Sequence, residues 1–168
     1  MEFSEVVKHR HSVRKYRKGA LINRDDVIKI LTAAMHAPSS NNSRPWEFVV
    51  VENKEIIEKL KNLHPYASML ETASLAIVVC AIPQFDDLSK GYWQQDCGAA
   101  IENLLLEAAN LNFGTCWCGI YPSLNKTEEF QKILDVKSIP LALIALGISE
   151  GEEPETKGFY DENKVKFI

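Results

Sequence analysis

The first group of residues suited to chemistry is a basic cluster near the N-terminus. Residues 8–18 hold six of the nineteen Lys and Arg residues of a chain whose formal net charge is −4. Arg10 and Arg14 could bind a phosphate with their guanidinium groups, and the hydroxyl of Ser12 could donate a further hydrogen bond. One alternative is a solvated basic helix end, where cations complement the helix dipole. A nucleic-acid-binding arm is a weaker alternative, because the acidic remainder of the chain would repel phosphates.

A second candidate is the polar loop at residues 37–46, which contains two prolines, three serines and two asparagines. Its prolines prevent the preceding helix from continuing, and the apolar run that follows is typical of a buried strand. Hydroxyls, amides and free backbone N–H groups are thus held between a helix and a strand. Together with the basic cluster, this loop suggests a flavin site. An ordinary helix-to-strand connection, with Trp46 as a core anchor, is the alternative.

A third candidate is the stretch at residues 114–120. On a strand, Cys116 and Cys118 point to the same side and Trp117 points to the other. Small buried thiols are the default interpretation, because no second cysteine pair or nearby histidine completes a zinc site. Gly119 is of more interest, since a glycine after a strand lets a backbone N–H approach a ligand closely.

Other common catalytic patterns are absent from the sequence. The four histidines form no helical metal pair with an adjacent acid, and each is better interpreted as a surface or hydrogen-bonding residue. The sequence has no G-x-S-x-G, no P-loop and no G-x-G-x-x-G fingerprint, so a dinucleotide would not be held by a Rossmann turn.

Alternating helices and strands must position these candidates. The apolar spacing predicts helices at about 24–35, 54–63, 93–111 and 126–134, after a short N-terminal helix that ends at 6–10. Strands are predicted at about 47–51, 75–81, 115–118 and 141–146. The helix at 93–111 is apolar around most of its circumference, which indicates a central helix packed partly against a second copy of the chain. Strands separated by helices indicate an α/β or α+β layered fold.

Length and composition fit one ordinary globular domain spanning residues 1–168, with 46% hydrophobic and 25% charged residues. The polar segment at about 149–168 is expected to extend from this domain and wrap onto a neighbour. We expect no nucleic-acid or membrane partner, and the N-terminus lacks the order of a signal peptide. Four cysteines without framework spacing favour reduced thiols in a cytoplasmic protein.

Taken together, these segments resemble the nitroreductase family of flavoenzymes. Arg10, Ser12 and Arg14 match its R-x-S-x-R motif, and residues 37–46 are similar to its A-P-S-S-x-N-x-Q-P-W loop. Residues 96–109 are similar to its long central helix, 114–119 to its G-x-C-W-x-G strand, and 140–147 to its last core strand. Two positions depart from the family pattern: Arg44 replaces the usual Gln, and Phe159 stands where many relatives have a second basic residue.

The resemblance implies an α+β fold with a central mixed sheet flanked by helices, in a domain-exchanged homodimer with one FMN in each of two interface sites. Arg10, Ser12 and Arg14 would hold the phosphate and ribityl chain, with contacts from the backbone and ring of His11. The loop residues that would reach the same flavin, the first three of them from the partner subunit, are Pro38, Ser39, Ser40 and Asn42. The backbone that would face the isoalloxazine near N5 is that of Cys118, Gly119 and Ile120. Lys157 is the candidate for a basic C-terminal contact to the phosphate.

The same resemblance implies hydride transfer from NADH or NADPH to flavin N5 and then, in a ping-pong sequence, to a nitroaromatic or quinone. The flavin would carry the chemistry, so no side chain is expected to act as a catalytic acid or base. The alternative is a flavin-binding or regulatory protein of the same fold without efficient turnover, for which the departures at Arg44 and Phe159 leave room.

Overall fold

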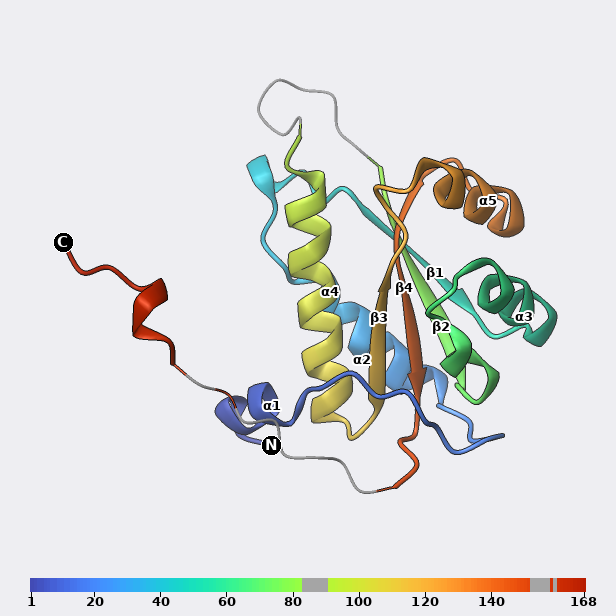
Figure 1. Cartoon of the computed structure of the whole chain (residues 1–168), viewed down its shortest axis with the longest axis horizontal. Coiled ribbons are helices and arrows are strands. Elements are labelled where there is room, and N and C mark those ends of the chain that lie inside the picture. Colours follow the sequence, from blue (N-terminus) through green and yellow to red (C-terminus); the bar gives the residue numbers. More distant parts are fainter. Residues whose placement is uncertain (83–90, 152–157, 159) are drawn as a thin grey trace.

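Four strands form one sheet with the spatial order β1-β2-β4-β3 (Figure 1). The computed structural model describes residues 1–82, 91–151, 158 and 160–168. The strands are β1 (Trp46–Val51), β2 (Leu75–Ala81), β3 (Gly114–Gly119) and β4 (Ile139–Gly147). The helices are α1 (Phe3–His9), α2 (Arg24–Met35), α3 (Lys54–Leu63), α4 (Trp93–Asn110) and α5 (Leu124–Leu134), with short 3-10 turns η1 (Ser40–Asn42), η2 (Ser68–Glu71) and η3 (Glu162–Lys164). The predicted α+β element order is confirmed.

All three strand pairings in this sheet are antiparallel. The expectation of a mixed sheet is therefore wrong: in the described part of the chain, parallel pairing is limited to an isolated bridge between Ser12 and Thr115, outside the named strands. The predicted strand at 115–118 extends by one glycine at each end. β3 is an edge strand, so one side of its backbone is free to bind the N-terminal segment and other groups.

Helices cover both faces of the sheet, because residues of β2 and β4 alternate between two apolar clusters. Ile77 and Ile144 face the cluster with α2 and α4, whereas Val78 and Leu143 face the cluster with α3, η2 and α5. β2 is buried throughout, β4 is buried except at Ile139, and α4 lies against one face of the sheet (Figure 1). α4 buries residues on several sides, as its apolar circumference predicts.

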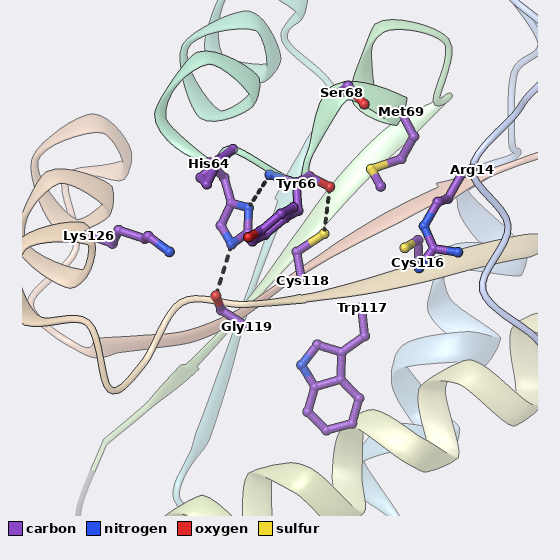
Figure 2. A pocket seen from close by; sticks show the side chains of 11 residues that line it. Arg14, His64, Tyr66, Ser68, Met69, Cys116, Trp117, Cys118, Gly119 and Lys126 are labelled. Atoms are coloured by element: carbon purple, nitrogen blue, oxygen red, sulfur yellow. Dashed lines mark hydrogen bonds between the residues drawn. The ribbon is translucent and has the colours of Figure 1, made fainter.

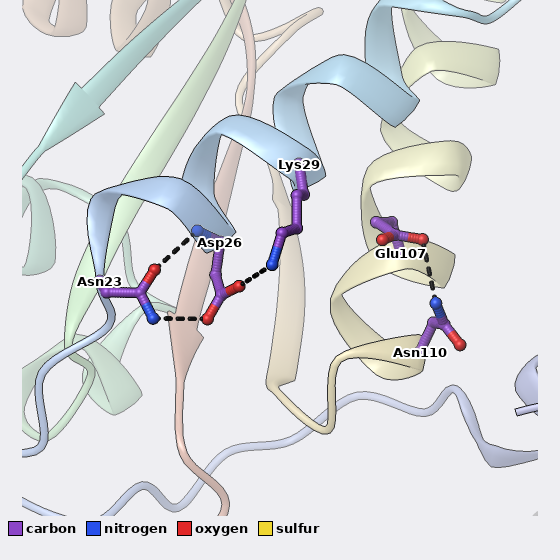
Figure 3. Close-up of polar contacts among 5 residues, drawn as sticks. All are labelled: Asn23, Asp26, Lys29, Glu107 and Asn110. Carbon is purple, nitrogen blue, oxygen red and sulfur yellow. Dashed lines mark hydrogen bonds and ion pairs between the residues drawn. The ribbon is translucent and has the colours of Figure 1, made fainter.

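The start of α2 is fixed by the predicted N-cap. The Asn23 side chain accepts a hydrogen bond from the Asp26 backbone N–H at 2.8 Å and donates to the Asp26 carboxylate at 2.7 Å (Figure 3). Lys29 pairs with the same carboxylate at 2.7 Å. These local contacts satisfy a free N–H of the first turn, so the helix begins at the predicted residue.

The N-terminal segment is fastened to the ends of β3 and β4 by two close approaches that only glycine permits. A Cβ on Gly147 would lie 2.7 Å from the ring of Tyr16, and one on Gly114 would lie 2.9 Å from Val13. The buried Tyr16 hydroxyl donates to the Val13 carbonyl at 2.8 Å, and the Val13 N–H donates to the Thr115 carbonyl at 2.8 Å. Residues 10–16 are therefore held in a defined path beside the sheet.

The C-terminal residues lead away from the sheet (Figure 1). The apolar side chains of Tyr160, Phe167 and Ile168 are exposed. The predicted wrapping of residues 149–168 onto a neighbour stays a prediction. Among the residues that the structure describes, no helix combines the length and the apolar character needed to cross a membrane.

Candidate functional site

A cavity of about 510 Å³ lies where the N-terminal segment, the turn after α3, the edge strand β3 and the start of α5 meet (Figure 2). Its lining residues are Arg14, His64, Pro65, Tyr66, Ser68, Met69, Cys116, Trp117, Cys118, Gly119 and Lys126. Arg14 and Lys126 supply cationic groups, and no carboxylate lines the cavity within the described ranges. The size and the mixture of apolar walls with few polar groups are typical of a small-molecule site.

The register of β3 determines which backbone groups face this cavity. The Ile120 N–H donates to the Leu141 carbonyl at 2.9 Å, so it is turned toward β4. Ladder hydrogen bonds alternate in direction along an antiparallel strand, which directs the N–H and carbonyl of Gly119 away from β4. A Cβ on Gly119 would meet no atom within 4 Å, so the space before it is open. Of the three predicted backbone contacts, Gly119 is therefore the one with a donor on the free edge.

His64 fixes the other wall of the cavity. Its ring is buried, with Nε2 at 2.9 Å from the Gly119 carbonyl and Nδ1 at 3.2 Å from the Tyr66 backbone N–H. Because Nδ1 must accept from an N–H, the proton belongs on Nε2, which donates to the carbonyl. His64 is thus a hydrogen-bonding histidine, as predicted, and it ties the turn after α3 to β3.

Cys116 and Cys118 point to the same side of β3, and the Trp117 ring points to the opposite side, as predicted (Figure 2). The neighbouring Cys118 thiol lowers the pKa of Cys116; burial opposes this shift and the Arg14 charge adds to it. The same interaction and burial raise the pKa of Cys118. The Cys118 thiol donates a hydrogen bond to the Tyr66 carbonyl, with 3.5 Å between sulfur and oxygen. All four cysteines are free and buried, as expected.

The basic cluster is only partly gathered at this cavity. Arg14 lines it, and its Nη1 donates to the Ser12 carbonyl at 3.3 Å. Arg10 and His11 instead line a separate small hollow next to Thr115, and Arg10 pairs with Glu102 at 3.5 Å. Ser12 is exposed beside β3. The structure therefore brings Arg14, Cys118 and Gly119 together in one cavity, with Arg10, His11 and Ser12 on the adjoining stretch.

The predicted loop residues Pro38, Ser39, Ser40 and Asn42 do not line this cavity. The loop contacts the first turns of α4, where the Ser40 N–H donates to the Asp96 carboxylate at 3.0 Å. Asp96 is buried, and its second carboxylate oxygen lacks a hydrogen-bond partner within the described part of the chain. This contact holds the loop on the side of the sheet that α2 and α4 cover.

Arg44, which replaces the family's usual Gln, braces this loop. Its Nε donates to the Asn42 side chain at 3.0 Å, and its backbone N–H donates to the Ser39 hydroxyl at 2.9 Å. Asn41, Asn42 and Arg44 all have positive φ angles between 48° and 53°. Such angles are uncommon for residues other than glycine, so these side-chain contacts help to maintain the shape of the loop.

Two predicted positions, Lys157 and Phe159, lie outside the described residues. Sequence reasoning did not assign His64, Tyr66, Met69 or Lys126 to the site. They come from a turn and from helix ends, where no periodic pattern marks a ligand-facing side chain. The only sequence feature that could have indicated them is the polar pair His64 and Tyr66, which directly follows an amphipathic helix.

Comparisons with known proteins agree with this geometry. A model of the nitroreductase family matches residues 7–65 and 62–148. A provisionally named NADH dehydrogenase/NAD(P)H nitroreductase from Methanothermobacter thermautotrophicus is 36% identical over 167 residues, covering 98% of this chain and 86% of that protein. The CLA biosynthesis enone reductase of Lactiplantibacillus plantarum is 38% identical over 169 residues, covering 98% of this chain and 76% of that protein.

A solved structure shows the same fold. The FMN-dependent nitroreductase from Clostridium difficile R20291 has a TM-score of 0.86 and 31% identity, with 96% of each chain covered. These similarities define the class of protein as an NAD(P)H-dependent flavin oxidoreductase. The chain belongs to the nitroreductase family, so both the resemblance and the α+β nitroreductase fold predicted from the sequence are confirmed.

Proposed function

We propose that this chain binds FMN at the edge of β3 and oxidises NADH or NADPH to reduce an electron-poor acceptor such as a nitroaromatic or a quinone. The main support for the proposal is that Arg14 and the unpaired backbone edge at Gly119 line the same cavity. When bound, FMN would supply the hydride-accepting and hydride-donating centre in a ping-pong exchange.

The described residues fit such a group. A cavity of about 510 Å³ has the volume of a typical cofactor site. The outward Gly119 N–H can donate a hydrogen bond to a ring nitrogen, and Arg14 can place positive charge beside an electron-rich ring edge. His64 holds the Gly119 carbonyl, which limits movement of this backbone and keeps the donor oriented.

The phosphate is expected to lie toward the adjoining stretch formed by Arg10, His11 and Ser12. Arg10 is positioned there by an exposed ion pair with Glu102, which has little net energy. Arg10 can therefore exchange that carboxylate for a phosphate at low cost. Lys157 remains the proposed contact from the C-terminal segment.

We propose further that the site is completed in a homodimer, with Pro38, Ser39 and Ser40 of one subunit reaching the flavin of the other. In a single chain this loop lies against α4 and away from the cavity. The exposed Trp117 ring beside α4 and the exposed apolar residues of the C-terminal segment supply surface for a partner. Free thiols at all four cysteines agree with the proposed cytoplasmic location.

The test is the absorbance spectrum of the purified protein, with FMN added if the protein is colourless. We expect a flavin spectrum that NADH or NADPH bleaches and that a quinone restores. A protein that remains colourless and does not bind added FMN would contradict the proposal. Bound flavin without steady-state NAD(P)H oxidation would favour a binding or regulatory protein of the same fold.

The acceptor is tested in the same assay. Because one relative is named an enone reductase, the acceptor panel contains an α,β-unsaturated ketone beside a quinone and a nitroaromatic. We expect the quinone and the nitroaromatic to reoxidise the reduced protein faster than the ketone. The reverse order would correct the acceptor class and leave the flavin site unchanged.

A further inference from the structure

Side-chain hydrogen bonds hold the turn after α3 against the free edge of β3. His64 Nε2 lies 2.9 Å from the Gly119 carbonyl oxygen, and the Tyr66 N–H donates to His64 Nδ1 at 3.2 Å. The Cys118 thiol donates to the Tyr66 carbonyl, with 3.5 Å between sulfur and oxygen. Figure 2 shows these three contacts side by side. Both ring nitrogens of the buried His64 are therefore engaged with backbone groups.

Gly119 presents two backbone groups on this edge, and only one of them lacks a partner. The N–H and carbonyl of a residue in an antiparallel strand point to the same side, and those of Gly119 point away from β4. His64 Nε2–H donates to the carbonyl. The Gly119 N–H has no partner among the residues that the structure describes, and a Cβ on this glycine would meet no atom within 4 Å. The edge therefore offers a ligand a free donor beside an acceptor that is already engaged.

We infer that His64 is a positioning residue that makes this edge selective for an acceptor atom, and that it thereby stabilises oxidised over reduced bound flavin. This inference rests on the proposed function. Oxidised FMN has a lone pair at N5 and accepts a hydrogen bond there, whereas two-electron reduction adds a hydrogen at N5, which then donates. The free Gly119 N–H fits the oxidised form. The reduced form would need the carbonyl that His64 engages, so the two forms differ in affinity.

This effect of His64 is separable from the charge of the cavity. Arg14 and Lys126 line the same cavity, and their positive charge favours the electron-rich reduced ring, which is the opposite direction. Because His64 Nδ1 accepts from an N–H, the proton of the ring is on Nε2 and the ring is neutral. Replacing His64 by another neutral side chain therefore changes the hydrogen bond and leaves the charge of the cavity as it is.

Two neutral substitutions separate the two hydrogen bonds of His64. His64→Gln can keep a donor toward the Gly119 carbonyl but gives up the acceptor at Nδ1. His64→Asn can keep an acceptor for the Tyr66 N–H but gives up the donor toward Gly119. The measurement is the midpoint potential of FMN bound to the full-length protein, obtained by anaerobic reduction with dithionite against a reference dye.

We expect His64→Asn to change the affinity ratio ~tenfold in favour of reduced FMN, which raises the two-electron potential by about 30 mV. His64→Gln should change this ratio by less than ~threefold, or about 15 mV. Equal shifts in the two variants, or no shift in His64→Asn, would overturn the inference. Weaker binding of both redox forms with an unchanged ratio would also overturn it, because a merely structural role gives that result.

A flavin analogue tests the same edge in the natural chain. Oxidised 5-deaza-FMN has a C–H group in place of N5 and cannot accept the hydrogen bond. We expect it to bind ~tenfold more weakly than FMN in a fluorescence titration, because one hydrogen bond is lost. Equal affinities would overturn the inference and leave the proposed flavin site intact. A chain that binds neither flavin would contradict the proposed function itself.

Discussion

The N-terminal segment and the loop after α2 both carry ligand motifs of the family, but the fold supports them differently. The segment is fastened beside β3 through Val13 and Tyr16, and it contributes to a cavity. The loop is anchored to α4 through the contact of Ser40 with Asp96, and it contributes nothing to that cavity. The difference supports the proposal that the first region forms a site within one chain and that the second serves the site of a partner subunit.

The largest expected effect is on stability, and it comes from disrupting the packing of the N-terminal segment against the end of β4. Gly147→Ala would place a methyl group 2.7 Å from the ring of Tyr16, which is fully buried. We expect the free energy of unfolding to fall by about 3 kcal/mol, as overpacking of a core does. Urea unfolding followed by circular dichroism measures this change.

Gly98→Ala in α4 is the matched control, because a Cβ there meets no atom within 4 Å. Its stability should be unchanged or slightly raised, since alanine favours a helix more than glycine does. If Gly147→Ala unfolds at the same urea concentration as Gly98→Ala, the segment is not fixed by this contact.

The second effect tests the charge that the segment brings to the cavity. Arg14→Ala should weaken FMN binding by about 2 kcal/mol, roughly thirtyfold, because a charge-assisted contact is lost. Arg10→Ala should cost less, since its side chain is shared with Glu102. Titration of flavin fluorescence measures both affinities. An unchanged affinity for Arg14→Ala would remove this residue from the flavin site.

The third effect tests whether the hydrogen bond between Ser40 and Asp96 positions the loop after α2. Asp96→Ala removes the acceptor of the Ser40 N–H, whereas Asp96→Asn keeps a carbonyl oxygen that can accept it. We expect the Ala variant to lose about 1 kcal/mol in FMN affinity and the Asn variant to lose less. The same fluorescence titration measures the FMN affinity of both variants. Equal losses in both variants would mean that the hydrogen bond to Ser40 does not position the loop.

The smallest expected effect is a pH dependence of stability that comes from Tyr16, which holds the N-terminal segment beside the sheet. Burial raises the pKa of Tyr16 above its ordinary value of 10.0, so the folded protein keeps this proton when the unfolded chain loses it. The stabilisation is complete below pH 10 and is lost as the pH rises above that value. Tyr16→Phe should therefore lose stability less steeply than the natural chain, by less than ~1 kcal/mol at about pH 10.3. Unfolding curves at about pH 8 and about pH 10.3 measure the difference between the two slopes. Parallel slopes would show that Tyr16 does not govern this pH dependence.

The sequence predicted most of the fold because its signals are local. α2, α3 and β2 begin and end at the predicted residues, since caps such as Asn23 and Asn53 and clear apolar periods mark them. α5 and β4 were predicted to begin at Lys126 and Leu141, two residues after their actual starts at Leu124 and Ile139. Element ends without such signals are the less predictable part.

The site was less predictable because it depends on which edge of a strand is free. The motif at 114–119 identified Gly119, but only the pairing of β3 with β4 shows that its N–H faces outward while that of Ile120 does not. Likewise, His64 and Lys126 reach the cavity from a turn and a helix end that are distant in the sequence. Such placements follow from tertiary packing and leave no local pattern.

The central claim is that FMN lies between the β3 edge of one chain and the loop of another. Dimers that combine one Arg14→Ala chain with one Ser40→Tyr chain test it directly, through the amount of FMN bound with natural affinity. If the loop acts on the partner's site, both lesions fall on one site and the other is intact, so half of the FMN binds with the natural affinity. If neither site of the mixed dimer retains that affinity, each lesion acts within its own chain and the claim is contradicted.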